Sequence, residues 1–326
     1  MATYYDIFGQ KVQYLSSDPA NVTEGQVWYN STSNTAKVAG ANVTATWSSG
    51  GNLNSPQATG ASFGTFTSTV GTGGYSPTVP GNKNSTEIYN GTSWSSGNTL
   101  NTARRSFRGA GEGETAGRVM GGVIGPPYTN VHEEYDGTSW TTTTALPANR
   151  GVHSATGTTA ASLVFGGYNP ATGIYGDTLE WSGSWTTGGT LNTARYHTAG
   201  FGSPTSAVMT TGQEPSLSNK TEEYDGTSWT VSNIYPASLE GVVAFGTQID
   251  GVASGGQPPY QSLAAVYDGT SWTTTTSLSA ERQQMYKGGN GPTGLVAGGE
   301  GPPGYMNVTE EWLGAGAPIT QTITTT

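Results

Sequence analysis

The sequence has no cysteine among its 326 residues. Disulfides, thiolate metal sites and cysteine nucleophiles are therefore excluded, so packing and backbone hydrogen bonds must stabilise the fold. Charged residues are also scarce, at 10% of the chain, and 22 acidic residues outweigh 12 basic ones to give a net charge of −10. Because a negative surface repels a phosphate backbone, we expect no nucleic-acid partner.

Long apolar runs are missing as well. No stretch reaches the roughly 18 consecutive apolar residues of a membrane-spanning helix, so we expect no membrane insertion. The N-terminal stretch MATYYDIFGQKVQ lacks the basic and apolar regions of a secretory signal. We therefore expect the chain to remain in the cell that makes it until that cell lyses.

Glycine and aromatic residues are abundant instead. The chain has 50 Gly, 9 Trp, 17 Tyr and 7 Phe, and this aromatic content is typical of a folded chain rather than a disordered one. One phrase recurs: EEYDGTSWTTTT begins at Glu133, and close copies begin at Glu87, Glu222 and Val266. A repeated phrase predicts a repeated structural unit.

Three columns of residues recur in register with this phrase. The tryptophan column has intervals of 43 to 47 residues and contains Trp47, Trp94, Trp140, Trp185, Trp229 and Trp272. The aromatic column just before it contains Tyr89, Tyr135, Trp181, Tyr224, Tyr267 and Trp312. A glycine doublet precedes both, at Gly73-Gly74, Gly121-Gly122, Gly166-Gly167, Gly255-Gly256 and Gly298-Gly299, with Thr211-Gly212 in one copy.

Each repeat is predicted to contain four strands. Short apolar runs such as SLVFGG lead into the doublet, where glycine indicates close approach of backbones. The Asp-Gly or Asn-Gly step favours a hairpin turn because Gly adopts positive φ, and the polar β-branched threonines after Trp suit an outer strand. Four strands in about 45 residues is the size of a β-propeller blade, so we predict an all-β fold.

These columns resemble the repeats of Kelch-type β-propellers, whose blades carry a Gly-Gly doublet, then a Tyr, then a Trp about five residues later. The resemblance covers about residues 37 to 316. The wording ARxxxxAG, GG, EEYDGTSW and LNTAR is further similar to Kelch-like repeats of virion structural proteins from tailed phages of marine bacteria. The resemblance implies a propeller fold and a structural role as a fibre or decoration protein.

The first and last copies are each incomplete. Residues 280–316 lack a Trp strand, whereas residues 42–53 supply a Trp strand with no preceding strands of their own. We predict that the Trp47 strand completes the last sheet beside the Trp312 strand, which closes a six-bladed ring and removes open strand edges. The predicted divisions are an N-terminal attachment arm at 1–36, a propeller at 37–316 and a C-terminal tail at 317–326.

An arginine column appears in four of the six copies, and a glutamate directly precedes the column aromatic in the same four copies. The two copies without this arginine have Ile88 and Val266 at the glutamate position. This joint presence and absence predicts four structural ion pairs: Arg104 with Glu134, Arg150 with Glu180, Arg195 with Glu223, and Arg282 with Glu311. A ring of arginines that grips an acidic ligand is the less favoured interpretation.

Two sets of aromatic residues are candidate contact sites. The loops after the glycine doublets are rich in Pro and Tyr, and a candidate interaction face consists of Tyr75, Tyr128, Tyr168, Tyr175, Tyr260 and Tyr305. Tyrosines that merely cover sheet edges are an equally weighted alternative. The N-terminal arm offers candidate assembly contacts at Tyr4, Tyr5, Ile7, Phe8, Trp28 and Tyr29, with packing against its own ring as the alternative.

Catalysis finds little support in the sequence. His132, His153 and His197 lack metal-ligand spacing, and the acidic pair Glu112 and Glu114 suits a solvated turn, so we expect no catalytic residues, cofactor or metal. The favoured function is a non-enzymatic virion component whose partners are other virion proteins, with a host surface glycan or protein as a further partner and a homo-oligomer as one assembly. A Kelch-like cytoplasmic adaptor and a carbohydrate-binding, lectin-like propeller are the alternatives.

Overall fold

The structure is a computed structural model that describes residues 12–19, 25–41, 44–77, 81–125, 127–302, 304–316 and 318–323. Every regular element in these ranges is a β-strand or an isolated β-bridge. The described residues accordingly include no apolar helix of the length that crosses a bilayer. The all-β prediction is confirmed.

The chain divides into two compact units. The larger unit is Trp47–Trp312, and the smaller unit combines Met1–Thr46 with Leu313–Thr326. The smaller unit contains one sheet in the order β1-β2-β3-β34. Its strands are β1 (Gln13–Leu15), β2 (Val27–Asn30), β3 (Thr35–Ala41) and β34 (Pro318–Ile323).

The pairing of β3 with β34 explains why this division differs from the boundaries at 36 and 317 that the sequence indicates. The two strands are antiparallel, with Ala36 opposite Ile323 and Ala41 opposite Pro318. A cut after residue 36 would fall inside β3. The segments before and after the repeats therefore contribute to one sheet.

The larger unit contains four-stranded antiparallel sheets that follow the sequence repeats. The first three sheets along the chain are β5 (Ala61–Thr65), β6 (Ser68–Tyr75), β7 (Asn82–Tyr89) and β8 (Trp94–Gly97); β9 (Arg108–Gly113), β10 (Ala116–Met120), β11 (His132–Tyr135) and β12 (Trp140–Thr143); and β13 (Ser154–Gly157), β14 (Ser162–Phe165), β17 (Thr178–Trp181) and β18 (Trp185–Thr187).

The next two sheets are β19 (Ala199–Ser203), β20 (Ser206–Thr210), β23 (Thr221–Tyr224) and β24 (Trp229–Ser232); and β25 (Val243–Thr247), β26 (Asp250–Ser254), β27 (Ala264–Tyr267) and β28 (Trp272–Thr274). The last sheet has the order β29-β30-β33-β4. Its strands are β29 (Tyr286–Gly289), β30 (Thr293–Ala297), β33 (Thr309–Leu313) and β4 (Thr46–Ser49). The strand that contains Trp47 thus lies beside the strand that contains Trp312, as the sequence predicts.

The turn between the third and fourth strands forms where Asp-Gly or Asn-Gly predicts it. In the second sheet, Asp136 Oδ1 accepts hydrogen bonds from the backbone N–H groups of Thr138 at 2.8 Å and Ser139 at 2.7 Å. Gly137 has a φ of 91°. Because Asp holds the turn through its own side chain, Tyr135 and Trp140 face each other across the two strands, with ring centroids 4.9 Å apart.

The loops after the glycine doublets carry short two-stranded ribbons in three repeats. These ribbons are β15 (Tyr168–Asn169) with β16 (Gly173–Ile174), β21 (Gln213–Glu214) with β22 (Ser216–Leu217), and β31 (Glu300–Gly301) with β32 (Gly304–Tyr305).

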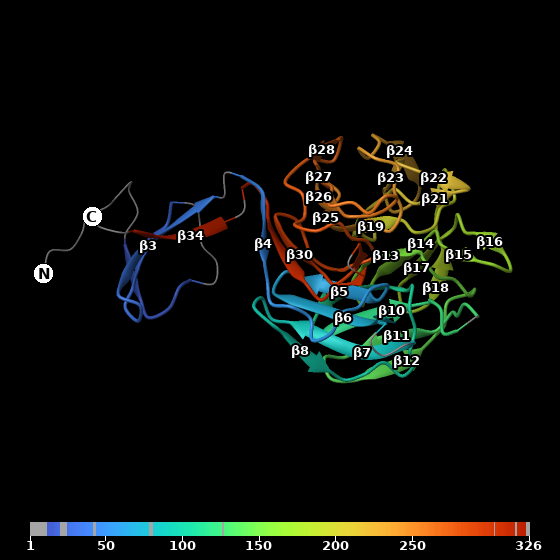
Figure 1. Cartoon of the computed structure of the whole chain (residues 1–326), viewed down its shortest axis with the longest axis horizontal. Helices are drawn as coiled ribbons and strands as arrows, with labels where there is room; N and C mark the ends of the chain where they lie inside the picture. The colour runs from blue at the N-terminus through green and yellow to red at the C-terminus, as the bar shows by residue number, and fades with distance from the viewer. Residues whose placement is uncertain are drawn as a thin grey trace, which may run out of the picture. The chain divides into compact units, whose positions relative to one another are not determined.

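The first strands of the sheets pack side by side in a cyclic order. β5 packs beside β9, β9 beside β13, β13 beside β19, β19 beside β25, β25 beside β29, and β29 again beside β5. Figure 1 shows the sheets of the larger unit arranged around a common centre. The core lies between neighbouring sheets, where clusters such as that of Phe63, Phe107, Val119 and Trp140 are buried.

A circuit of backbone hydrogen bonds joins the residues that stand just before these first strands. The residues are Thr59, Ser106, Val152, His197, Gly241 and Gln284, and we call them the backbone circuit. Each N–H donates to the carbonyl of the circuit residue in the preceding repeat, and Thr59 N donates to Gln284 O at 3.0 Å. All six residues have a φ between 51° and 69°, a conformation uncommon for residues other than glycine.

The glycine doublets make a second set of contacts between neighbouring repeats. The second glycine donates to a backbone carbonyl of the next repeat, as in Gly74 N to Arg104 O at 2.8 Å, and Gly299 N donates to Gln57 O at 2.9 Å. A Cβ on Gly298 would lie 2.5 Å from the Gln57 carbonyl oxygen. The predicted close approach of backbones at the doublet is therefore present.

Candidate functional site

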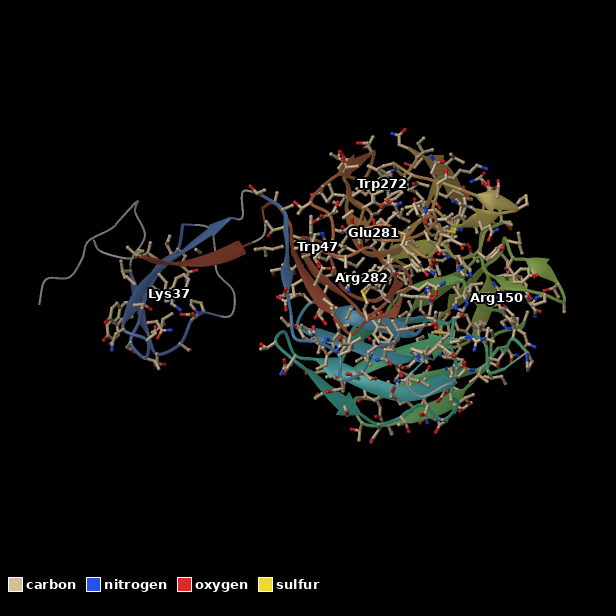
Figure 2. The ribbon with its side chains drawn as sticks, viewed as in Figure 1. Lys37, Trp47, Arg150, Trp272, Glu281 and Arg282 are labelled. Carbon is tan, nitrogen blue, oxygen red and sulfur yellow. The ribbon has the colours of Figure 1, made fainter. Side chains whose placement is uncertain are left out.

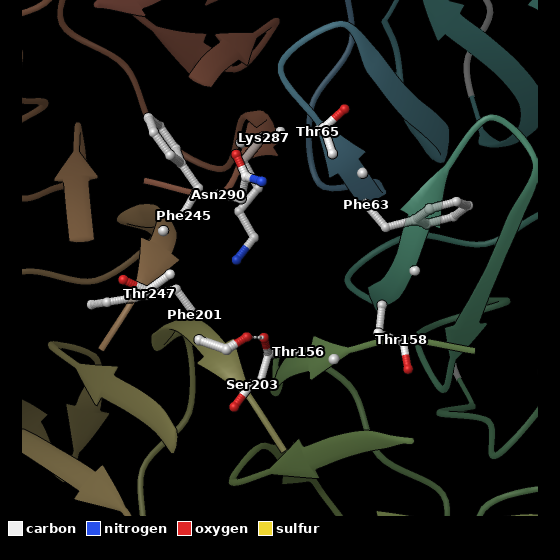
Figure 3. Close-up of a pocket in the computed structure, with 18 of the residues that line it drawn as sticks. Phe63, Thr65, Thr156, Thr158, Phe201, Ser203, Phe245, Thr247, Lys287 and Asn290 are labelled. Carbon is white, nitrogen blue, oxygen red and sulfur yellow. Dashed lines mark hydrogen bonds between the residues drawn. The ribbon is translucent and has the colours of Figure 1, made fainter. Parts of the chain in front are cut away.

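A cavity of about 650 Å³ lies at the centre of the larger unit. Residues from the first strand of each sheet of that unit line it, together with the turns that follow those strands. Its lining combines glycines, the rings of Phe63, Phe201 and Phe245, and several hydroxyl groups (Figure 3). Its size is within the range of small-molecule sites, about 300 to 1,000 Å³.

Two cations lie close to each other here, Lys287 in the lining of this cavity and Arg108 beside a smaller neighbouring hollow. Lys287 lines the cavity and extends into it, as Figure 3 shows. A smaller hollow of about 20 Å³ shares Ser62, Ala155 and Lys287 with the cavity and is also lined by Arg108. The Lys287 ammonium donates to the carbonyl oxygen of Gly200, and Arg108 Nη1 donates to the carbonyl oxygen of Phe107 at 2.9 Å.

The surroundings of these two cations affect their protonation. Burial, together with the neighbouring positive charge of Arg108, lowers the pKa of Lys287 to about 7. Burial lowers the pKa of Arg108 to about 10. Sequence reasoning missed both residues, although each stands alone as a cation in a column of mostly small residues; Ser62, Gly109, Ala155, Gly200 and Ala244 occupy the Lys287 position in the other repeats.

The three histidines occupy different places in the larger unit. His132 Nδ1 lies 3.0 Å from the carbonyl oxygen of Thr144, and His197 Nδ1 lies 3.3 Å from Nε2 of Gln284. His153 is buried. Burial lowers the pKa of each, to about 4 for His132 and His197 and well below the usual value for His153.

The predicted tyrosine face forms a partly continuous belt. Tyr75 and Tyr305 lie 5.6 Å apart between ring centroids, Tyr128 and Tyr168 lie 6.0 Å apart, and Tyr196 stacks on Tyr168 at 5.1 Å. Arg105 links the two groups, since its guanidinium lies 5.7 Å from the centroid of Tyr75 and its charge acts on Tyr128. All these tyrosines are half-buried.

The remaining two tyrosines of the predicted face lie at other positions of the same loops. Tyr175 receives the guanidinium of Arg150 at 4.1 Å from its ring centroid, and its hydroxyl donates to the carbonyl oxygen of Asn149 at 3.0 Å. Tyr260 lies close enough to Glu300 that this carboxylate raises its pKa, after burial as the larger cause. We call Tyr75, Tyr305, Tyr128, Tyr168 and Tyr196 the tyrosine belt; sequence reasoning missed Tyr196.

The arginine column forms ion pairs, but with different partners from those predicted. Arg104 pairs with Glu133, Arg150 with Asp177 at 2.8 Å, Arg195 with Glu222 at 2.9 Å, and Arg282 with Glu310 at 2.6 Å. Each arginine is at most 1% exposed. Arg150 and Arg282 lie inside the larger unit in Figure 2. These buried, hydrogen-bonded positions indicate a structural role.

The predicted pairings with Glu134, Glu180, Glu223 and Glu311 are therefore wrong. Adjacent residues of a strand point to opposite faces, so Glu133 and Tyr135 share the face that meets Arg104 while Glu134 points to the other. Three of the four copies have a glutamate at both positions, but the comparison favoured the second column because Leu179 stands at the first position in the third copy. In the first copy, Gln57 Nε2 donates to Glu87 Oε1 at 2.9 Å in place of an ion pair.

The glutamates that were predicted to pair with arginine contact the neighbouring repeat instead. Glu180 accepts a hydrogen bond from the hydroxyl of Tyr224, Glu223 from that of Tyr267, and Glu311 from that of Tyr89. Glu134 has Trp181 as its aromatic neighbour in the next repeat and lies 3.2 Å from Arg118, whose guanidinium covers the Trp181 ring. These contacts join successive sheets.

The assembly residues predicted in the N-terminal arm are only partly described. Tyr4, Tyr5, Ile7 and Phe8 lie outside the described residues. Trp28 is fully buried and its Nε1 donates to Asp18 at 3.0 Å. Tyr29 stacks on Tyr14, with ring centroids 5.1 Å apart, and Tyr14 is 75% exposed. In the smaller unit, Trp28 therefore serves the core, and the Tyr14–Tyr29 pair presents aromatic surface.

Comparison with known proteins gives a fold and no family. No family model matches the sequence, and no curated protein matches it. Among 387 matching chains of solved structures, the structure of YjhT aligns with a TM-score of 0.69 at 14% identity, covering 84% of this chain and 100% of that one. At this identity the likeness concerns the fold alone, and with the four-stranded antiparallel sheets it is consistent with a β-propeller.

Proposed function

We propose that the chain is a non-enzymatic structural protein of a phage virion, in which a six-bladed, Kelch-like propeller serves as a rigid interaction scaffold. The six-bladed form is supported by the backbone circuit, which returns from Gln284 to Thr59 through one residue of each repeat. It is also supported by the position of β4 beside β33, which gives the last sheet its fourth strand.

The observation that carries the scaffold role is the tyrosine belt. Its residues lie in loops anchored by β-bridges, such as that between Gly151 and Tyr168 and that between Tyr196 and Gln213. Tyrosine offers flat apolar area with a hydroxyl at its tip and loses little conformational entropy on binding. Loops on a rigid framework often carry recognition, so this belt suits contact with a protein or a sugar.

The virion assignment rests on two further points. The repeat wording is similar to that of virion structural proteins, and the smaller unit gathers β3 and β34 from the two ends of the chain into a sheet of its own. A separate unit with the exposed Tyr14 on its surface suits attachment to other particle proteins. Attachment through this unit would leave the tyrosine belt for a host surface glycan or protein.

Proteomics of purified particles tests the virion assignment. Peptides of this chain should copurify with phage particles from a lysate through a density gradient, in a constant ratio to capsid protein. Detection in uninfected cells, with none in particles, would overturn the assignment and favour the cytoplasmic adaptor.

A binding assay tests the belt. The labelled chain should bind host cells, and the double variant Tyr128→Ala with Tyr168→Ala should lose at least about tenfold in affinity, or about 1.4 kcal/mol. Tyr14→Ala, in the smaller unit, is the matched control and should bind as the unchanged chain does. A glycan array identifies the lectin-like alternative, and equal cell binding by all variants would exclude the belt.

A further inference from the structure

Arg108 and Lys287 differ from the other cations of the described residues. Arg104, Arg118, Arg150, Arg195 and Arg282 each lie within 4 Å of a carboxylate, as do Lys37 and Lys220. Burial lowers the pKa of Lys83, and the negative charge of Glu87 acts to raise it. Arg105 donates a hydrogen bond to Asn82, and its guanidinium lies over the ring of Tyr75. The side-chain hydrogen bonds of Arg108 and Lys287 go only to the carbonyl oxygens of Phe107 and Gly200.

These two cations repel each other inside the larger unit. No carboxylate contributes to the pKa of either one, whereas Arg108 contributes to lowering that of Lys287. Both side chains are half-buried. Withdrawing an unpaired charge from water is costly, and placing a second like charge nearby adds to the cost. A chain with a net charge of −10 has ample carboxylates, yet none lies beside this pair. In this arrangement an anion bound from solution would supply the missing negative charge.

We propose that the central cavity binds a small oxyanion, with Lys287 as its direct contact and Arg108 as the second positive charge. The carboxylate or phosphate group would lie at the end of the cavity that Lys287 reaches. Ammonium and guanidinium groups bind such oxygens through charge-assisted hydrogen bonds. The cavity volume of about 650 Å³ leaves room for a ligand larger than the anionic group itself.

Other groups in the cavity are compatible with this ligand. Hydroxyl groups line it at Thr65, Thr158 and Thr247 and can donate to a polar ligand. Glu112 is the acidic residue in the lining, and it is exposed and accepts hydrogen bonds from the N–H and hydroxyl of Thr159. Glu112 lies near the end of β9, six positions after the circuit residue Ser106, whereas Lys287 lies only three positions after Gln284.

Proton linkage gives the site a signature that surface binding lacks. The charge of Arg108 on β9 acts on Lys287 on β29. His197 and His153 also lie near Arg108 and are neutral at pH 7, since their pKa values are lowered. The lowered pKa of Lys287 means that part of its population is neutral near pH 7. A bound anion favours the charged form, so binding should take up protons near neutral pH and weaken as pH rises from about 7 to 9.

Titration calorimetry with inorganic phosphate, and separately with acetate, tests the proposal on the whole chain. Binding should be detected below about 10 mM for at least one of the two anions, and comparison of the two distinguishes a phosphate site from a carboxylate site. Lys287→Met and Arg108→Gln should each reduce the affinity at least about tenfold, equal to about 1.4 kcal/mol. Lys287→Arg keeps the charge and should retain binding.

The control is Lys220→Met, which removes the same charge from an exposed ion pair with Glu214. It should bind as the unchanged chain does, and circular dichroism checks that every variant is folded. The proposal fails if neither anion binds, if Lys220→Met weakens binding as much as Lys287→Met does, or if affinity and heat are independent of pH and buffer. Because Lys287→Arg tests charge without removing a side chain, misfolding of Arg108→Gln leaves the proposal testable.

Discussion

The indole Nε1 of Trp94 donates a hydrogen bond of 2.9 Å to the hydroxyl of Thr309, 215 residues later in the chain. The same contact joins Trp140 to Thr86, Trp229 to Thr178 and Trp272 to Thr221. In each case the tryptophan of one repeat reaches the third strand of the preceding repeat. Through the Trp94–Thr309 bond, the first sheet therefore contacts the last sheet in the same way as each later sheet contacts the one before it.

Replacing Thr309 with Val should destabilise the larger unit by about 1 to 3 kcal/mol, because the buried Trp94 N–H would lose its acceptor. Chemical denaturation followed by tryptophan fluorescence measures this change. Thr141→Val, on the exposed Thr run of β12, is the control and should change the free energy of unfolding by less than about 0.5 kcal/mol. Equal effects at both positions would contradict the interpretation.

Two repeats lack this hydrogen bond. Trp185 Nε1 donates instead to the carbonyl oxygen of Thr144, and the Trp47 repeat offers the opposite experiment. Trp47 Nε1 is buried without a hydrogen-bond partner, and Ala264 occupies the position that corresponds to Thr309. Ala264→Thr should supply the missing acceptor and stabilise the chain by about 1 kcal/mol relative to Ala264→Val, which has the same shape. Thermal unfolding of the two variants compares them directly, and a Val variant as stable as the Thr variant would rule out the bond.

The corrected ion pairs predict that substitutions of two adjacent glutamates reduce the free energy of unfolding by clearly different amounts. Arg195→Met should cost about 3 to 5 kcal/mol of unfolding free energy, since it leaves the fully buried Glu222 carboxylate without its cation. Glu222→Gln should also destabilise strongly, whereas Glu223→Gln keeps an acceptor for the Tyr267 hydroxyl and should cost about 1 kcal/mol. Urea denaturation measures all three variants; a larger loss for Glu223→Gln than for Glu222→Gln would restore the original pairing.

Glycine at the doublet can be required by the close approach of another backbone or by its positive φ, and two substitutions distinguish these causes. Gly298 and Gly173 both have positive φ, 68° and 92°, but a Cβ on Gly173 meets no atom within 4 Å. Gly173→Ala should therefore cost only the conformational penalty of about 1 to 2 kcal/mol. Gly298→Ala should cost clearly more because of its contact with the Gln57 carbonyl, as measured by thermal unfolding; similar costs would show that conformation alone selects glycine there.

The histidines predict the response of stability to acid. Their folded pKa values, about 4 for His132 and His197 and lowered by burial for His153 as well, lie below the unfolded value near 6.5. Between these values the unfolded chain binds more protons, so stability should fall as pH drops from about 6.5 to 4. Calorimetric melting across this window measures the fall, and His197→Gln should make it shallower. A melting temperature that rises on acidification would refute this assignment.

The sequence allowed prediction of features that side-chain identity repeats. The same residue types recur in most repeats at the positions of Tyr135, Asp136-Gly137 and Trp140. The strands, the hairpin and the position of β4 beside β33 could therefore be predicted from these recurring residues. The arginine column was also visible, but a choice between Glu133 and Glu134 depends on which face of β11 meets Arg104. The presence-and-absence comparison favoured the wrong column, because Leu179 stands at the Glu133 position in the third copy, where Asp177 pairs with Arg150 instead.

Other features repeat only in backbone conformation or appear once. The members of the backbone circuit have unrelated side chains, from Val152 to Gly241, and share only their positive φ and their hydrogen bonds. Arg108 and Lys287 come from different repeats, and only the cyclic order of the first strands brings them together. Their pairing could not be inferred before the position of β9 relative to β29 was known.

The backbone circuit has a consequence for how the molecule opens. A linear array of repeats frays from its terminal members, which have one neighbour each. In the circuit every member has two, because its N–H donates to one neighbour and its carbonyl accepts from the other. Hydrogen exchange at Thr59, Ser106 and Gln284 should thus proceed at nearly one common rate, governed by global unfolding rather than by distance along the polypeptide.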